Sequence, residues 1–144
     1  MAEVPSVCEH VHLPMQSGSS RMLKRMLRRY TREGYLECVD RIRRAMPGVA
    51  LTTDIIVGFP GETHAEFAET FRFIDELPFT YLHVFTYSAR PGPPAAEAPD
   101  QVPMPVRKQR NRELRELADR KHLRLREGVR GGPPPGGARC PSTA

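Results

Sequence analysis

The sequence has no apolar run long enough to cross a bilayer, and it does not open on a signal-peptide pattern. We therefore expect a soluble, cytoplasmic protein with no membrane partner. Cysteine is also scarce, because the chain has only three, at Cys8, Cys38 and Cys140. An odd, scattered set fits neither a disulfide framework nor a metal-binding knuckle, so each is expected to be a reduced thiol.

Several common catalytic patterns are absent as well. The chain contains no Ser-His-Asp set, no P-loop and no complete Rossmann fingerprint. Among its histidines, only His10 and His12 have the spacing of a metal-ligand pair. Alternate residues of a strand point to one face, so a metal is conceivable there. A strand-face pair without a third ligand is nevertheless more often structural.

What the chain does have is strongly patterned charge. The net charge of +5 is unevenly distributed, because two basic segments lie on either side of an acidic segment. Residues 21–46 hold nine basic and three acidic residues, residues 47–103 hold two and eight, and residues 104–127 hold nine and four. Basic helices fit a polyanion such as RNA, although solvated Arg and Lys faces are also common in proteins without such a partner.

Length and composition predict the domain organisation. At 144 residues the chain is one domain or part of one. We expect residues 1–127 to form it, with strands and helices over about 8–103 and a charged helix over 104–127. Residues 128–144 hold five Gly and four Pro and almost nothing to bury, so this tail is expected to be disordered.

Hydrophobic spacing predicts alternating strands and helices. Strands are expected over residues 10–16, 50–57 and 81–87, and helices over 22–30, 32–46 and 104–127. Another helix is expected after Thr63, with Phe67, Phe71 and Ile74 on its buried face. Thr31 is an expected N-cap, and Thr63 with Glu66 has the spacing of a capping box. Strands separated by crossover helices indicate a parallel α/β fold, and three strands suit half of a barrel or a truncated open sheet.

Polar and glycine residues gather at the three predicted strand ends, where parallel α/β folds bind ligands. Asp54 lies in an Ile/Val run, where an unpaired carboxylate is costly. It therefore either binds a ribose hydroxyl or an ammonium group, or pairs with a buried arginine. Gln16 either orients a ligand or satisfies the backbone of a turn. Arg28 lies on the polar face of its predicted helix, where a solvated charge is the common alternative.

Four motifs follow one another in the chain: HLPMQSGS at 12–19, MLRRYT at 26–31, TDIIVGFPGET at 53–63 and HVFTYSARPG at 83–92, with PDQVP at 99–103 continuing the series. Together they resemble the radical-SAM methylthiotransferases, which insert a methylthio group into tRNA or a ribosomal protein. The resemblance spans about residues 8 to 127. The HVFTYSARPG and PDQVP segments look closest to the branch that acts on threonylcarbamoyladenosine next to the tRNA anticodon.

The resemblance implies a partial (β/α) TIM-like barrel, of which this chain holds the C-terminal half. It implies S-adenosylmethionine (SAM) and [4Fe–4S] clusters as cofactors. By position, Gln16, Arg28 and Asp54 match family residues that contact the ribose and methionyl groups of SAM. With the adjoining turns, the expected cofactor-binding residues are Gln16, Ser17, Ser19, Arg28, Asp54, Gly58 and Gly61. The two glycines would let the backbone lie against the adenine ring.

The family's CxxxCxxC motif is absent from this sequence, and its three distant cysteines cannot replace it as cluster ligands. The resemblance therefore implies a fragment of a tRNA methylthiotransferase that is inactive alone. In the full enzyme, a 5′-deoxyadenosyl radical from SAM would abstract hydrogen from the adenine ring before sulfur enters. The implied partners are tRNA and the missing N-terminal half of the enzyme. Two other interpretations stay open: a non-catalytic RNA-binding remnant, or a fragment of a ribosomal-protein methylthiotransferase.

Overall fold

The computed structural model describes residues 9–129 as a small parallel sheet with helices. Its strands are β1 (His10–His12), β2 (Ala50–Val57) and β3 (Tyr81–Thr86). Its helices are α1 (Ser20–Arg25), α2 (Arg32–Ala45), α3 (His64–Glu76), the short 3₁₀ helix η1 (Pro94–Ala96) and α4 (Met104–Val129). Cys8, Cys140 and the predicted disordered tail from residue 130 onward lie outside the described residues.

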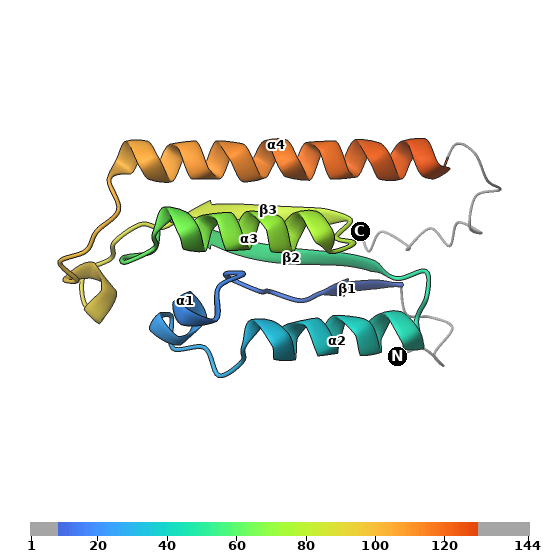
Figure 1. Cartoon of the computed structure of the whole chain (residues 1–144), viewed down its shortest axis with the longest axis horizontal. Helices are drawn as coiled ribbons and strands as arrows, with labels where there is room; N and C mark the ends of the chain where they lie inside the picture. Colours follow the sequence, from blue (N-terminus) through green and yellow to red (C-terminus); the bar gives the residue numbers. More distant parts are fainter. Residues whose placement is uncertain (1–8, 130–144) are drawn as a thin grey trace, which may run out of the picture.

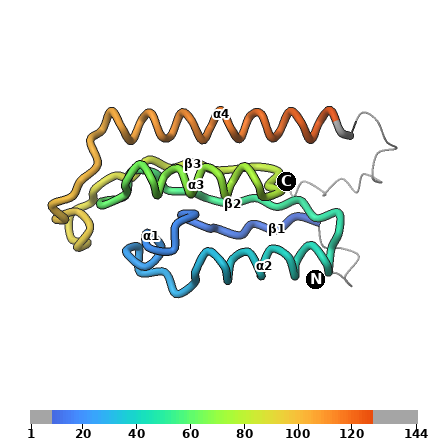
Figure 2. Tube along the Cα trace, in the orientation of Figure 1, coloured from blue at the N-terminus to red at the C-terminus, as the bar shows by residue number. Residues whose placement is uncertain are grey.

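The sheet has the order β1-β2-β3, and both pairs of neighbouring strands are parallel. Helices α2 and α3 are therefore the crossover connections that the predicted α/β pattern requires. Figure 1 shows α2, α3 and α4 running alongside the strands, whereas α1 lies beyond the carboxyl ends of the strands. The tube trace in Figure 2 shows the same arrangement. The parallel α/β prediction is confirmed, and the architecture corresponds to part of a (β/α) barrel.

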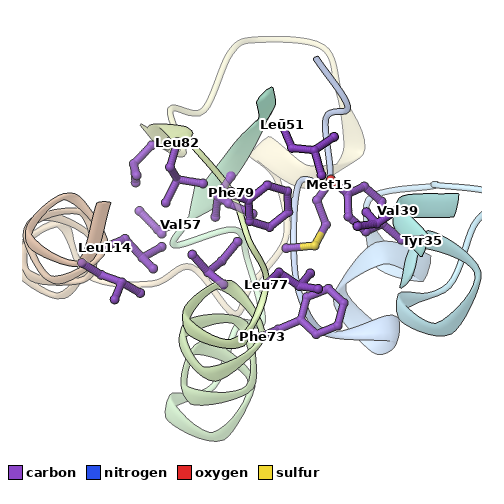
Figure 3. Packing of buried hydrophobic residues seen from close by; sticks show 14 of the residues in the cluster. Met15, Tyr35, Val39, Leu51, Val57, Phe73, Leu77, Phe79, Leu82 and Leu114 are labelled. Atoms are coloured by element: carbon purple, nitrogen blue, oxygen red, sulfur yellow. The ribbon is translucent and has the colours of Figure 1, made fainter. Parts of the chain in front are cut away.

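The two faces of the sheet have opposite character. On one face, Leu51, Ile55, Val57, Leu82 and Val84 belong to the same buried cluster as side chains of α2, α3 and α4. Figure 3 shows part of this cluster, with Leu51, Val57 and Leu82 of the strands among the labelled side chains. Strand side chains alternate between faces, so β1, β2 and β3 place the intervening residues on the other face. That face is open, since Tyr81 and Phe85 there are 52% and 53% exposed.

Helix α1 is shorter than the sequence predicts. It ends at Arg25, and Leu27 adopts a left-handed backbone conformation with a φ of 58°. The Leu27 N–H donates to the Lys24 carbonyl (3.0 Å) and the Arg28 N–H donates to the Leu23 carbonyl (2.9 Å). This is the Schellman closure, which normally places glycine in the left-handed position. The prediction that Arg28 lies on the polar face of a longer helix is therefore wrong, because the residue follows the helix end.

Both predicted N-caps are confirmed. The Thr31 side chain accepts a hydrogen bond from the Gly34 N–H at 3.1 Å. Thr63 and Glu66 form a reciprocal capping box at the start of α3, and Arg21 also pairs with Glu66. Although burial raises the pKa of Glu66, the bonds from Arg21 and Thr63 outweigh it and hold that pKa below its ordinary value.

Two arginines of α4 are buried rather than solvated. Arg110 donates to a carboxylate oxygen of Glu62 at 2.7 Å and to its carbonyl at 3.1 Å, in a pair that is 5% and 1% exposed. Arg107 donates to the carbonyls of Val102 (2.6 Å) and Tyr87 (3.1 Å). These bonds join α4 to the loops that follow β2 and β3. The segment 104–127 therefore offers a partner fewer positive charges than its composition suggests.

Glu62 is held from two sides inside this arrangement. The Gly58 N–H donates to its carboxylate at 3.0 Å, and Arg110 donates to the same oxygen. Burial raises the pKa of Glu62, and the bonds from Gly58 and Arg110 oppose that rise. Removing the negative charge would leave the Arg110 guanidinium buried without a counter-ion, which is the costly way to break such a pair.

Within residues 9–129, no helix has both the length and the apolarity needed to span a membrane.

Glu62→Gln should lower the free energy of unfolding by about 3 kcal/mol, because it strips the buried Arg110 of its counter-ion while keeping the side-chain shape. The measurement is a urea unfolding curve of the whole chain. Glu76→Gln is the matched control, since Glu76 is exposed at the end of α3, and its effect should stay within about 0.5 kcal/mol. Equal midpoints for the two variants would contradict a stabilising role for the Glu62–Arg110 pair.

Gly58→Ala should also destabilise the fold, by about 3 kcal/mol from left-handed strain and overpacking together. Gly58 has a φ of 75°, and an added methyl group would collide with Cγ of Arg107 and lie 3.0 Å from its Cβ. Gly34→Ala is the control, because the nearest atom to a methyl there is 3.5 Å away. In helix α2 that change should raise stability by up to about 1 kcal/mol. Unfolding curves in which Gly58→Ala matches Gly34→Ala would refute the packing argument.

Candidate functional site

Gln16 lies where the chain leaves β1, at the carboxyl edge of the sheet. Its backbone N–H donates to the Asp54 carbonyl (2.8 Å), and its carbonyl accepts from the Ile56 N–H (3.0 Å). The residue has a φ of 72°, in the left-handed region that favours glycine. A non-glycine residue in this region costs roughly 1–3 kcal/mol and persists only where its surroundings fix it. Both backbone bonds to β2 do so here.

Two tyrosines hold the same segment from the helix side. The Tyr35 hydroxyl donates to the Leu13 carbonyl at 2.7 Å, and the Tyr30 hydroxyl donates to the Met15 carbonyl at 3.0 Å. Burial raises the pKa of Tyr35 well above its usual value, so the hydroxyl keeps its proton and remains a donor. The stretch from Leu13 to Gln16 is thus fixed between β2 and the region from Tyr30 to Tyr35.

Asp54 lies on the open face of the sheet, not in the apolar core. Its side chain is 22% exposed, and its Oδ2 lies 3.1 Å from Nε2 of His12 on the neighbouring strand. Of the two alternatives for Asp54, the pairing with a buried arginine is not found among the described residues, where its side-chain partner is this histidine. No side chain among residues 9–127 bonds the other carboxylate oxygen. Asp54 and Gln16 are brought together, since Gln16 bridges to β2 at Ile55.

Four polar side chains form a hydrogen-bonded line on the open face, in the order Asp54, His12, Thr52 and His10. Nδ1 of His12 lies 2.9 Å from the Thr52 hydroxyl, which lies 3.2 Å from Nε2 of His10. The His12 ring also meets the His83 ring edge to face, with centroids 5.9 Å apart. No group of three or more His, Cys, Asp or Glu side chains within the described part of the chain has the geometry to hold a metal ion. The Thr52 hydroxyl lies between the His10 and His12 rings.

The two predicted glycines are covered on their Cα side. Gly58 lies against the aliphatic part of Arg107. Gly61 has a φ of 83°, and an added methyl there would lie 2.6 Å from Oδ2 of Asp100, which pairs with Arg25 at 2.8 Å. Both glycines are thus required by the packing of arginine side chains. A contact between their backbone and an adenine ring stays a prediction.

The two predicted serines have structural partners. Ser17 and Ser19 are 1% and 2% exposed. The Ser17 hydroxyl lies 3.4 Å from that of Thr70 and accepts from the Ser19 N–H at 3.2 Å. Ser19 is the N-cap of α1 and accepts from the Met22 N–H. Their hydroxyls shape the turn after Gln16, and a direct bond to a cofactor remains untested.

Arg28 is exposed and lies in the connection between α1 and α2. Figure 1 shows this connection at the same end of the sheet as the strand carboxyl ends. The structure gives Arg28 no bond to Asp54 or Gln16, so its role as a cofactor ligand stays a prediction. The sequence analysis does not identify His12 as the partner of Asp54. The alternation of side chains along the two predicted strands could have indicated it, because His10, His12 and Asp54 fall on one face of the sheet.

A separate groove of about 350 Å³ lies between β3 and α4. It is lined by side chains from both elements: Tyr81, Leu82, His83, Val84, Phe85, Arg115, Ala118, Asp119 and His122. None of the seven predicted cofactor residues belongs to this lining. The groove is therefore distinct from the carboxyl edge, where Gln16 and Asp54 meet. That edge offers one free carboxylate oxygen, an accessible amide and an open sheet face, which suits hydrogen-bond donors such as hydroxyl or ammonium groups.

Known proteins match this chain along most of its length. tRNA-2-methylthio-N(6)-dimethylallyladenosine synthase 1 of Mycobacterium marinum is 51% identical over 120 residues, covering 83% of this chain and 23% of that protein. The corresponding synthase of Thermobifida fusca is 50% identical over 120 residues (83% and 24%), and that of a Thermoanaerobacter species is 46% identical over 131 residues (91% and 28%). The chain thus spans about a quarter of the length of these relatives.

These relatives do not confirm the expected threonylcarbamoyl branch, because their names specify dimethylallyladenosine. A model of the Radical SAM superfamily matches residues 1–74, slightly more than half of the 144 residues. The matched region includes β1, β2 and both Gln16 and Asp54. The sequence resemblance, the parallel α/β fold and this match agree, and the chain belongs to the radical SAM superfamily.

Proposed function

We propose that this chain is part of a radical-SAM tRNA methylthiotransferase and carries one side of its SAM site. The observation that carries the proposal is identity of about 50% to tRNA-2-methylthio-N(6)-dimethylallyladenosine synthases over 83% of the chain. The names of these relatives favour dimethylallyladenosine over threonylcarbamoyladenosine as the modified base. They also favour tRNA over a ribosomal protein as the substrate. A tRNA substrate in turn supports a cytoplasmic location.

The residues at the carboxyl edge fit SAM in charge and in hydrogen-bond capacity. SAM carries an ammonium group and ribose hydroxyls, all of which donate hydrogen bonds. The free Asp54 oxygen and the amide oxygen of the Gln16 side chain are acceptors, and the backbone of Gln16 is bonded to β2. When bound, SAM supplies the radical chemistry of the family. The role of this chain is to bind and orient the cofactor, with Gln16 and Asp54 as the central pair and Arg28 as a candidate for its carboxylate.

The cluster that reduces SAM requires ligands from elsewhere. Fe–S clusters need closely set thiolates, and the three cysteines of this chain are far apart in sequence. Cys38, within the described residues, is a free thiol. We propose that the cluster ligands belong to a part of the enzyme outside these 144 residues, as the one-quarter coverage of the relatives allows. This chain is then inactive without that part.

The exposed basic residues near the carboxyl edge are the proposed tRNA contacts. Lys24 lies in the last turn of α1 and Arg29 follows this helix, and both are exposed. Arg107 and Arg110 are excluded from such a surface, since they are buried and bonded to loops. Positive side chains beside the cofactor site would hold the backbone of the substrate by phosphate contacts. The alternative of a non-catalytic RNA-binding remnant predicts the same contacts but no affinity for SAM.

Asp54→Asn should weaken SAM binding at least tenfold, because the change keeps the shape of the side chain and removes its charge. Calorimetric titration of SAM into the complete polypeptide encoded by the gene measures this. Asp40→Asn, at an exposed position of α2, is the matched control and should leave the affinity unchanged. An affinity for Asp54→Asn equal to that of the control would eliminate Asp54 from the SAM site.

Lys24→Gln with Arg29→Gln should weaken tRNA binding and lower the slope of log affinity against log salt concentration by about 1–2. Filter binding at several salt concentrations gives that slope. Arg43→Gln with Arg44→Gln is the control, because these exposed residues lie in the last turn of α2, at the opposite end of the sheet from α1 (Figure 1). If both pairs change the slope equally, tRNA contact at the carboxyl edge is not supported. Salt-sensitive tRNA binding without SAM binding would favour the remnant.

A further inference from the structure

We propose that His12 is the positioning residue for Asp54, and that a proton gained by His12 weakens the hold of Asp54 on a cationic ligand. This inference rests on the proposed SAM site and adds a residue and a pH response to it. The geometry that carries it is the contact of 3.1 Å between Nε2 of His12 and Oδ2 of Asp54. The His12 ring is fixed at its other nitrogen by Thr52 at 2.9 Å.

With a neutral His12, each hydrogen bond in the line from His10 to Asp54 has one donor and one acceptor. A bond to the carboxylate requires a proton on Nε2, because the ionised carboxylate only accepts. Nδ1 then has a lone pair and accepts from the Thr52 hydroxyl. The Thr52 oxygen in turn accepts from Nε2 of His10, at 3.2 Å. Every donor in the line has an acceptor, and the direction of all three bonds is set by the charge of Asp54.

The same line also accommodates a cationic His12. In that state Nδ1 carries a proton and donates to the Thr52 oxygen, which has two lone pairs and still accepts from Nε2 of His10. No bond is lost, so protonation changes the charge beside Asp54 without disrupting the geometry. A positive imidazole 3.1 Å from the carboxylate would offset the negative charge that attracts an ammonium or sulfonium group.

The groups that face His12 are few. Asp54 and Thr52 face it from β2, His10 from its own strand, and His83 from β3, with ring centroids 5.9 Å apart. The apolar side chains of α2, α3 and α4 pack against the opposite face. On the open face, His83 lines a groove together with Arg115, Asp119 and His122 of α4. His12 and Asp54 are 41% and 22% exposed, so water screens their interaction and the pH effect is modest. His10 and His83 are both imidazoles near His12, and neither makes a polar bond to Asp54.

The test compares SAM affinity at pH 8 and pH 6 in wild type, His12→Gln and His83→Gln, each in the complete polypeptide. On going from pH 8 to pH 6, wild-type affinity should fall by about threefold more than that of His12→Gln, because a histidine can take up a proton and glutamine cannot. A change of this size is typical of exposed ion pairs. Gln at position 12 keeps an N–H donor for Asp54 but cannot titrate. His83→Gln should retain the wild-type ratio.

A ligand-free measurement separates the two proposals. ¹⁵N-detected NMR of the labelled chain at pH 8 should show His12 with its proton on Nε2, and Asp54→Asn should shift that tautomer balance. If wild type fails to bind SAM, the proposed function fails, while the tautomer still tests the His12–Asp54 pair. If SAM binds and His12→Gln keeps the wild-type pH ratio, or if His12 carries its proton on Nδ1, the positioning role is overturned.

Discussion

The buried bonds of Arg107 and Arg110 are the interaction on which the other features of this fold depend. The carboxyl ends of β2 and β3 run into loops whose carbonyl groups and acidic side chain need partners. Arg110 satisfies Glu62, and Arg107 satisfies the carbonyls of Val102 and Tyr87. Both arginines lie in the first two turns of α4. The helix is therefore fixed to the strand ends by guanidinium groups as well as by the apolar contacts of Leu114 and Leu117.

This arrangement holds the carboxyl edge of the sheet by polar bonds and leaves one face of the sheet open. Arg107 and Arg110 of α4 contact the loop after β2, and Gln16 makes two backbone bonds to β2. A left-handed glutamine is tolerated only where such bonds fix it. Because the core lies entirely on the helix side, the opposite face can carry polar groups without burying them unpaired. Asp54 and His12 can thus stay partly hydrated and accessible to a ligand.

Sequence reasoning succeeds here where structure is determined locally. The capping box of Thr63 and Glu66 depends on residues three apart, and the crossover helices follow from hydrophobic spacing. It fails where partners come from distant segments. Asp54 and His12 are 42 positions apart and Glu62 and Arg110 are 48 apart, so no local pattern links them. The early end of α1 is a third case, because Leu27 takes a left-handed conformation that favours glycine.

The open face also constrains how the site can work. Tyr81 and Phe85 are about half exposed on it, and β1 and β3 both end the sheet with free edges among the described residues, which are features that proteins normally cover. If the rest of the enzyme covers this face, water leaves the surroundings of Asp54 and His12. Their attraction then strengthens as the local dielectric falls. A pair that is weak and hydrated in the isolated chain would become a stronger determinant of cofactor charge in the assembled site, so the polar line from His10 to Asp54 gains importance as the barrel is completed.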